Sequence, residues 1–355
     1  MLIILKELEE SFMAPGRLEN LHRVVNGKKV LILTHNNPDP DALATGWALK
    51  FLLEKKFKVN SILVYGGIIT RAENQAMVRL LNIRIKPLEM VNVRDFSAIA
   101  LVDTQPGAGN NNLPTLVQPT VVIDHHGLGK SIKGVDFSDI RPHYGSSATI
   151  LTEYLFQAGL PITEKIATAL YYGIKTDTQG LGRYATEEDY KATIRLYPHI
   201  QIKILSQIEY PEFSRDYFED FDRALHIGKI YGDVVLCDLQ SLTKKDMVAL
   251  MSDFFLRLSG IRWSFVMGMD ETRLIFSLRA KHSNQNAGRM VRKIIKGLGS
   301  AGGHQMIAGG QIPIKGLTSE KKEEMRQALG RRFLKVVGQE KAKGERLLHL
   351  HRGPW

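Results

Sequence analysis

Short apolar runs alternate with longer amphipathic segments along the first half of the chain. The apolar runs are rich in β-branched and aliphatic residues and predict four strands, at residues 30–34, 59–64, 97–102 and 119–123. The segments around them repeat apolar residues at helical spacing and predict four helices, at residues 41–54, 72–81, 146–158 and 163–175. This alternation predicts an α/β domain with a parallel sheet covered on both faces.

Two helix-like segments, near residues 187–197 and 199–208, follow this alternation and predict a connector. From Ile227 onward strand-like runs return, for example Trp263-Ser264-Phe265-Val266-Met267. We therefore expect a parallel-sheet N-terminal domain and a smaller α/β C-terminal domain, with the active cleft between them. The expected ranges are residues 1–195 for the first domain, 196–215 for a helical connector, 216–345 for the second domain and 346–355 for a frayed tail.

Composition narrows the class of protein. At 355 residues, with 44% hydrophobic and 24% charged residues, the chain is long enough for two globular domains with separate cores. Cys237 is the only cysteine, which excludes a disulfide framework and a thiolate zinc site and favours a reducing, cytoplasmic setting. Acidic residues near the N-terminus argue against a signal peptide, and no apolar run approaches ~18 residues, so no membrane span is expected.

Polar side chains follow several of the apolar runs. The segment His35-Asn36-Asn37-Pro38-Asp39-Pro40-Asp41 follows the first predicted strand, Asp103 follows the third, and Asp124-His125-His126 follows the fourth. Asp177 comes at the end of a later apolar segment. Because ligands bind beyond the carboxyl ends of the strands in open parallel sheets, we expect these side chains, each after a strand-like run, to meet at one edge.

These side chains suit metal-dependent hydrolysis. The candidate ligands are His35, Asp39, Asp41, Asp103, His125 and Asp177. Carboxylate oxygens with a minority of imidazoles favour divalent ions such as Mg²⁺ and Mn²⁺. Six ligands are too many for one catalytic ion with open positions and suit a pair that shares a bridging carboxylate, which favours attack of water at phosphorus. Taken alone, each aspartate is more often a turn former or a helix N-cap, so the prediction depends on the joint pattern.

The chain resembles the DHH phosphoesterase superfamily, which is named for the triplet seen here as Asp124-His125-His126. The resemblance continues in Tyr144-Gly145-Ser146-Ser147-Ala148-Thr149 and in Gly173-Ile174-Lys175-Thr176-Asp177-Thr178. The glycine-rich stretch from Gly299 to Gly310 is similar to the signature of the DHH-associated C-terminal domain. The resemblance extends over nearly the whole chain.

The resemblance implies a role for each residue of the motifs. It places the metal ligands on the six candidates, with Asp41 and Asp103 in the central positions, and it implies two divalent ions, Mn²⁺ ahead of Mg²⁺. Asp124 would orient its neighbours, and His126 would face the substrate as a phosphate contact or proton donor. The chain departs from the family at Ala44-Thr45, where Gly-Ser is frequent, but this departure removes no ligand.

A basic stretch without any carboxylate runs from Thr272 to Ser319, in a chain whose net charge is +11. Cations and the backbone N–H groups of glycines can approach phosphate oxygens together, so this stretch favours an anionic ligand over a merely basic surface. The expected substrate-binding residues are Arg279, His304, Gly302, Gly303 and Asn74. For Asn74, polar capping of a helix start is an equal alternative. A helix opening at Gly145-Ser146-Ser147 could hold a phosphate or use these serines only as caps.

Within the superfamily, the chain looks like the stand-alone members that degrade short oligoribonucleotides to mononucleotides, some of which also convert 3′-phosphoadenosine 5′-phosphate to AMP. The expected partner is a short single-stranded oligonucleotide or nucleotide, and a homodimer is also allowed. One alternative is hydrolysis of a cyclic dinucleotide or its linear product, of the c-di-AMP/pApA type; another is hydrolysis of pyrophosphate or polyphosphate. A non-catalytic nucleic-acid-binding module is the alternative of another class, and the complete set of ligands argues against it.

Overall fold

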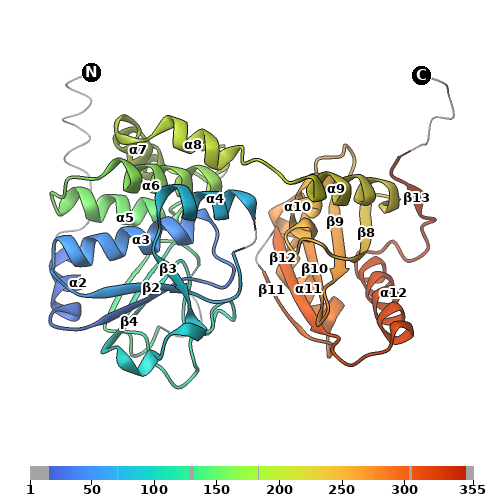
Figure 1. The fold of residues 1–355 in the computed structure, drawn as a ribbon, viewed down its shortest axis with the longest axis horizontal. Coiled ribbons are helices and arrows are strands. Elements are labelled where there is room, and N and C mark those ends of the chain that lie inside the picture. Colours follow the sequence, from blue (N-terminus) through green and yellow to red (C-terminus); the bar gives the residue numbers. More distant parts are fainter. Residues whose placement is uncertain (1–15, 70, 128–131, 183, 304–305, 349–355) are drawn as a thin grey trace. The chain divides into compact units, whose positions relative to one another are not determined.

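The computed structural model describes residues 16–348, apart from residues 70, 128–131, 183 and 304–305. The chain divides into two compact units, unit 1 from Met1 to Pro211 and unit 2 from Glu212 to Trp355. Figure 1 shows a sheet with helices packed against it in each unit. Each unit also has a hydrophobic core of its own.

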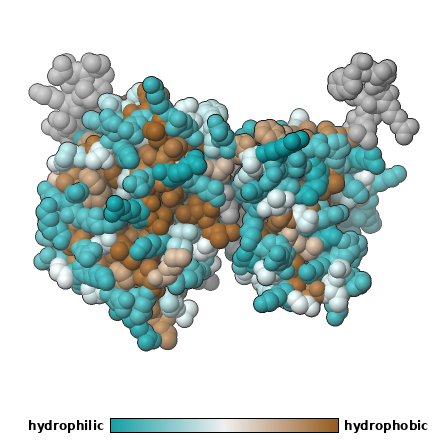
Figure 2. Space-filling view, viewed as in Figure 1, coloured by the Kyte–Doolittle hydropathy of each residue, from teal (hydrophilic) through white to brown (hydrophobic). Residues whose placement is uncertain are grey.

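Polar side chains cover most of the face of each unit that is seen in Figure 2, with smaller apolar patches between them. Such a mixture is usual, because folded proteins do not have enough polar surface to cover themselves completely. Among the residues that the structure describes, none of the helices has both the length and the apolar character needed to cross a membrane.

Unit 1 is built on a six-stranded sheet in which all neighbouring strands run parallel, in the order β3-β2-β1-β4-β5-β6. The strands are β1 (Val30–Leu33), β2 (Ser61–Tyr65), β3 (Ile85–Pro87), β4 (Ala98–Val102), β5 (Val121–Asp124) and β6 (Phe137–Ile140). The four predicted strands correspond to β1, β2, β4 and β5. The strand order reverses between β1 and β4, and both of these strands are buried along their whole length.

Helices cover one face of this sheet. They are α2 (Arg17–Val25), α3 (Pro40–Lys55), α4 (Ala72–Leu81), α5 (Ser147–Gln157), α6 (Glu164–Asp177), α7 (Glu187–Leu196) and α8 (Ile202–Glu209). Val30 and Ile32 of β1 point to this helical face, whereas Leu31 and Leu33 point to the other face, because successive side chains of a strand alternate. The predicted α/β fold with a parallel sheet is confirmed.

The opposite face of the sheet is covered by irregular segments and two short 3-10 helices, η1 (Leu88–Met90) and η2 (Val93–Asp95). Leu88, from the segment after β3, packs against Leu31 in this second core. The connection from β4 to β5 contains Gly107 and Gly109, both with positive φ, and forms turns rather than a helix. Both faces are therefore covered, as predicted, but only one of them by the α-helices described above.

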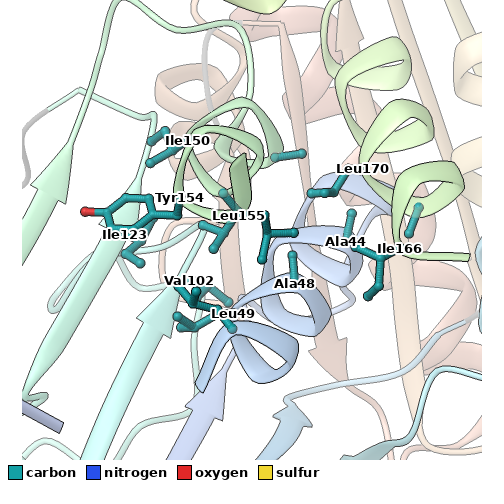
Figure 3. Close-up of a cluster of buried hydrophobic side chains, with 14 of the residues drawn as sticks. Ala44, Ala48, Leu49, Val102, Ile123, Ile150, Tyr154, Leu155, Ile166 and Leu170 are labelled. Atoms are coloured by element: carbon teal, nitrogen blue, oxygen red, sulfur yellow. The ribbon is translucent and has the colours of Figure 1, made fainter. Parts of the chain in front are cut away.

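Small residues bring the end of α6 close to the start of α3. Figure 3 shows Leu170 of α6 beside Ala44 of α3 within the core of unit 1. At Gly173 of α6, an added Cβ would lie 3.2 Å from the Cβ of Ala44 and 3.2 Å from the Cα of Asp41. A larger side chain at Gly173 would push the two helices apart, and with them the polar residues at their ends.

Unit 2 contains a mixed seven-stranded sheet in the order β11-β12-β10-β9-β8-β7-β13, in which only β8 and β9 pair in parallel. The strands are β7 (Lys229–Tyr231), β8 (Val234–Ser241), β9 (Trp263–Met269), β10 (Arg273–Ala280), β11 (Ser300–Gly303), β12 (Ile307–Pro313) and β13 (Glu345–Arg346). The helices α9 (Arg215–Ile227) and α10 (Met247–Phe255) pack on one face, and α11 (Ala287–Ile295) and α12 (Ser319–Val336) on the other. This second, mixed-sheet unit agrees with the predicted C-terminal α/β domain.

Candidate metal centre

Three strands of unit 1 carry polar side chains to the carboxyl edge of the sheet. His35 lies two residues after β1, Asp103 follows β4 directly, and Asp124 is the last residue of β5, with His125 and His126 next in the chain. Strands β1 and β4 are neighbours where the strand order reverses, which is the position at which such sheets bind ligands. Asp103 has a φ of 56°, a left-handed conformation that aspartate tolerates better than most residues and that turns the chain after the strand.

Two helices supply the remaining carboxylates. Asp39 is the N-cap of α3 and accepts the N–H of Ala42 at 3.0 Å, and Asp41 lies in the first turn of the same helix. Asp177 is the last residue of α6. The prediction that Asp177 follows a strand-like run is therefore wrong: the apolar run before it is the predicted helix, which is buried on most sides and ends two residues later than expected.

The structure brings all six candidate ligands together, and we call them the ligand cluster: His35, Asp39, Asp41, Asp103, His125 and Asp177. Together with His126, their side-chain atoms form three overlapping groups, each within 4.8 Å: Asp103, His125 and His126; His35, Asp39 and Asp103; Asp41, His125 and Asp177. Oδ2 of Asp103 lies 3.4 Å from Nε2 of His35, and its Oδ1 lies 3.6 Å from Nε2 of His125. One carboxylate thus faces two histidines, as expected of a carboxylate that bridges two cations.

The two histidines of the ligand cluster have their ring nitrogens arranged as metal ligands do. Nδ1 of His35 lies 3.0 Å from the carbonyl oxygen of Asn36, and Nδ1 of His125 lies 3.1 Å from that of Tyr144. A carbonyl oxygen only accepts, so Nδ1 carries the hydrogen and Nε2 of the neutral ring has a lone pair. Nε2 of His125 is buried without a hydrogen-bond partner and lies 3.2 Å from Oδ2 of Asp177. A lone pair beside carboxylates requires a cation between them, so these residues fit a metal ion.

The electrostatics of the ligand cluster lead to the same conclusion. Burial lowers the pKa of His125, but the close contact with Asp177 and the charges of Asp103 and Asp41 outweigh burial and hold this pKa well above its usual range. Burial raises the pKa of Asp177 to about 6, and the charges of Asp39 and Asp103 add to this effect against the opposing contact with His125. The ligand cluster therefore attracts positive charge, which protons or divalent cations can supply.

The N-terminus of α5 holds two of the aspartates. The N–H groups of Ser147 and Ala148 each donate to the carboxylate of Asp41 at 2.7 Å, and the hydroxyl of Ser147 donates to Asp103 at 3.0 Å. Ser146 is the N-cap of α5, and its side chain accepts the N–H of Thr149. Of the two interpretations of this turn, binding of phosphate is wrong, because the N–H groups of the first turn are already bonded to protein oxygens.

His126 is oriented by its neighbour in the DHH triplet. Its Nδ1 lies 2.8 Å from Oδ1 of Asp124, which is buried and also accepts the side-chain N–H of Gln105 at 2.7 Å. Burial lowers the pKa of His126, but the hydrogen bond to Asp124 outweighs it and raises the pKa above its ordinary value. The side chain of His126 is one-third exposed, unlike that of His125, which is 13% exposed. His126 is thus the more accessible of the two rings.

Known proteins resemble this chain over the segment that contains most of the ligand cluster. Residues 29–174 match the DHH family, N-terminal domain. The uncharacterized protein MJ1633 of Methanocaldococcus jannaschii is 31% identical over 357 residues, covering 94% of this chain and 73% of that protein. The chain belongs to the DHH family. The uncharacterized protein MG371 of Mycoplasma genitalium is 27% identical over 174 residues, covering 47% of this chain and 51% of that protein.

A solved structure shares the fold of this DHH chain. An exopolyphosphatase-related protein from Bacteroides fragilis matches with a TM-score of 0.69 and 17% identity, over 91% of this chain and 98% of that one. The chain therefore has a DHH phosphoesterase-like fold. Five members of the ligand cluster lie inside the matched DHH segment, and Asp177 lies three residues beyond its end.

The expected substrate-binding residues of unit 2 are positioned as follows. Arg279 lies on β10, is 4% exposed, and its guanidinium forms an ion pair with Asp253 and donates to the hydroxyl of Ser277 at 2.7 Å. Gly302 and Gly303 lie on β11, and an added Cβ at Gly303 would lie 2.4 Å from the Cα of Ala308, so pairing with β12 requires glycine there. His304 lies outside the described residues. Substrate contacts by these residues stay predictions.

Asn74 supports the loop between His35 and Asp39, the first two ligands in the chain. It lies in the first turn of α4, is 5% exposed, and donates to the carbonyl oxygen of Pro38 at 2.9 Å. This contact fixes the loop next to Asp39. A direct contact between Asn74 and substrate stays a prediction.

Sequence reasoning missed several residues that hold the ligand cluster in place. Gln105 holds Asp124, and Asp189 accepts the N–H of Gly145 at 2.8 Å, directly before the serines of the α5 turn. The spacing from Thr186 to Asp189 has the form of a capping box and could have placed Asp189 at the start of a helix. Its contact with Gly145 joins residues 44 apart in the sequence, and no local pattern signals such a contact.

Proposed function

We propose that this chain is a metal-dependent phosphoesterase that hydrolyses short oligoribonucleotides to mononucleotides and also converts 3′-phosphoadenosine 5′-phosphate to AMP. The observation that carries the proposal is the position of Asp103, whose two oxygens face the Nε2 atoms of His35 and His125. Two ligand groups that share one carboxylate suit a pair of divalent cations, which is the arrangement that favours in-line displacement at phosphorus.

The ligand cluster would hold the two cations, Mn²⁺ in the first place and Mg²⁺ as the substitute. His35 and Asp39 lie on one side of Asp103, and Asp41, His125 and Asp177 lie on the other. Bound there, the cations supply an activated water molecule and stabilise the charge that develops on the phosphoryl oxygens. The helix N-terminus at Ser147 fixes the carboxylate of Asp41 in place, because two backbone N–H groups donate to it.

His126 is the proposed proton donor or phosphate contact. Its Nδ1–H is committed to Asp124, so its Nε2 is the nitrogen that can exchange a proton with substrate. The raised pKa of His126 increases the fraction of protonated ring near neutral pH, as a proton donor to the leaving oxygen requires. Its accessibility supports this assignment over that of a further metal ligand.

Unit 2 would bind the far end of the substrate. The basic stretch from Thr272 to Ser319 contains Arg279, His304 and the glycines of β11, and it has no carboxylate of its own. Arg279 is buried against Asp253, which keeps the guanidinium in one orientation. The proposal thus assigns metal binding and catalysis to residues 1–195 and the contacts with the far end of the substrate to residues 216–345.

The test is release of mononucleotides from a 5′-phosphorylated diribonucleotide, with Mn²⁺ and with a chelator. Parallel substrates are an RNA of about 24 nucleotides, 3′-phosphoadenosine 5′-phosphate, a cyclic dinucleotide, pyrophosphate and polyphosphate. We expect rapid Mn²⁺-dependent release from the diribonucleotide and little attack on the long RNA. Preferential cleavage of the cyclic dinucleotide, pyrophosphate or polyphosphate would overturn the assignment of substrate but not that of the metal site.

A further inference from the structure

The turn between β6 and α5 is linked by hydrogen bonds to the DHH triplet. The backbone N–H of Arg141 donates to the carbonyl oxygen of Asp124 at 2.9 Å, and the N–H of Tyr144 donates to the carbonyl oxygen of Arg141 at 3.0 Å. The carbonyl oxygen of Tyr144 in turn accepts Nδ1–H of His125 at 3.1 Å. These bonds close a ring from Asp124 through the turn to His125, so the orientation of the imidazole depends on the position of one backbone carbonyl group.

The side chain of Tyr144 anchors that carbonyl group from behind. Its hydroxyl donates to Oε1 of Glu153 at 2.7 Å and accepts from Nη1 of Arg141 at 2.9 Å. Arg141 also forms an ion pair with Glu153, and its guanidinium lies over the ring of Tyr144, 4.9 Å from the centroid. All three side chains are at least nine-tenths buried. Tyr144 is therefore held at both its backbone and its ring.

Arg141 is itself fixed by a second carboxylate. Its Nε and Nη2 donate to the two oxygens of Asp139 at 2.9 and 2.8 Å, a bidentate geometry that sets the plane of the guanidinium. Asp139 also accepts from Tyr154 at 2.9 Å and forms an ion pair with Arg17. We call this set the buried arginine network: Arg17, Asp139, Arg141, Tyr144, Glu153 and Tyr154.

The charges of the buried arginine network are balanced internally. Two arginines face two carboxylates, and burial of such groups costs free energy that hydrophobic side chains of similar volume would not. None of the carboxylates in this network belongs to the three groups of possible metal ligands found among the described residues. Within the described part of the chain, a side chain of the ligand cluster bonds to this network where His125 meets the carbonyl oxygen of Tyr144. Groups that hold the second nitrogen of a ligating histidine fix its orientation and its tautomer.

We propose that Arg141, Tyr144 and Glu153 are positioning residues for His125: they fix the carbonyl oxygen that receives Nδ1–H and so direct Nε2 into the ligand cluster. The inference rests on the proposed function only in that the ligand cluster binds a divalent cation. It does not depend on which phosphate ester is hydrolysed.

Two tyrosine variants test this inference. Tyr144→Phe and Tyr154→Phe each remove one buried hydroxyl that donates to a carboxylate of the buried arginine network. Tyr154 has no backbone bond to His125, and Figure 3 shows its hydroxyl pointing out of the apolar cluster in which its ring lies. We expect similar losses in melting temperature but different effects on Mn²⁺. Tyr144→Phe should weaken Mn²⁺ binding by about tenfold, the lower end of the effect of outer partners on metal affinity, whereas Tyr154→Phe should leave it within about twofold.

Mn²⁺ binding is measured on the full chain by titration with detection of free Mn²⁺ by electron paramagnetic resonance. The ¹⁵N resonances of His125 provide a second readout, and they should shift in Tyr144→Phe and not in Tyr154→Phe. If Tyr144→Phe fails to fold, Glu153→Gln, which keeps the shape of the side chain, replaces it with the same expectation. Equal Mn²⁺ affinities of the two variants would overturn the inference, as would a parent protein that binds no Mn²⁺. A parent that binds Mn²⁺ but cleaves no RNA would overturn the proposed substrate and leave this inference standing.

Discussion

Unit 1 contains two groups of buried carboxylates that compensate their charge in different ways. In the buried arginine network, Asp139 and Glu153 are both paired with Arg141. In the ligand cluster, histidines are the only cationic side chains that the described residues bring within ion-pair distance of the aspartates. Both histidines of the cluster have already committed Nδ1–H to a carbonyl oxygen. The negative charge of the first group is therefore balanced by the protein itself. That of the second group requires positive charge from outside the protein.

The difference shows which buried charges serve the fold and which serve chemistry. Arginine cannot lose its proton, so the network around Arg141 stays paired at any ordinary pH. Aspartates gathered without arginine or lysine repel one another, and a folded core tolerates them only where a cation is bound. The two groups are joined by the segment from Arg141 to Ala148, which bonds to the first group at one end and to Asp41 at the other.

The largest effect on the ligand cluster is expected from Asp103→Ala. It removes the carboxylate that faces both histidines, so we expect loss of metal-dependent turnover and Mn²⁺ binding weakened by more than about 100-fold. Asp136→Ala, at an exposed position of the same unit, is the matched control and should bind Mn²⁺ like the parent. Turnover retained in Asp103→Ala would contradict the bridging role.

Arg141→Met removes a cation from the buried arginine network, whereas Asp103→Ala removes a carboxylate from the ligand cluster. It leaves the buried Glu153 without a cationic partner and Asp139 with Arg17 alone, so the free energy of unfolding should fall by about 3–5 kcal/mol. Urea denaturation of the metal-free protein measures this change. A loss below about 1 kcal/mol, the value typical of an exposed pair, would show that the network contributes little to stability.

Arg279→Ala extends the comparison to unit 2, where an arginine is paired with the partly exposed Asp253. If Arg279 binds a substrate phosphate, the KM for 3′-phosphoadenosine 5′-phosphate should rise by about tenfold, the effect of one charged hydrogen bond, with a smaller change for a generic phosphodiester. Lys281→Ala, two residues further along the same basic stretch, is the control and should change KM little. An equal rise for both substrates would contradict the proposed contact with a second phosphate.

The smallest effect is expected in the pH dependence of the melting temperature, whose sign should differ between the metal-free and the Mn²⁺-bound protein. The pKa of Asp177 is raised from 3.8 to about 6, so its contribution to the stability of the metal-free protein is present at low pH and is lost as pH rises through about 6. With Mn²⁺ the opposite holds, because deprotonation strengthens metal binding. The melting temperature should therefore fall between about pH 4 and 7 with chelator and rise over the same range with Mn²⁺. Parallel curves would contradict a metal site at Asp177.

Much of unit 1 could be predicted from the sequence because its central strands are short, continuous apolar runs. Strands β3 and β6 could not, since they lie at the edges of the sheet and are partly exposed. In β6, Phe137-Ser138-Asp139-Ile140, two polar residues stand between two apolar ones. The assignment of Asp177 to a strand end was wrong because buried helices and buried strands both appear as apolar runs.

The ligand cluster was predictable because its members are chemically distinctive, whereas the residues that hold it are not. Tyr144 acts through its backbone carbonyl, which every residue possesses. Glu153 and Asp189 lie on helices, where carboxylates are ordinarily solvated, and only the structure shows them buried. Contacts between distant segments carry no local sequence signal, so the ligands could be predicted and their supports could not.

The most direct test of the account is the number of Mn²⁺ ions bound per chain, counted by native mass spectrometry of the parent and of Asp103→Ala. We predict two ions on the parent and a loss of binding in the variant, because the two ligand groups share Asp103. A parent that binds no Mn²⁺, or a variant that binds the same number as the parent, would contradict the claim that this cluster of carboxylates is completed by metal.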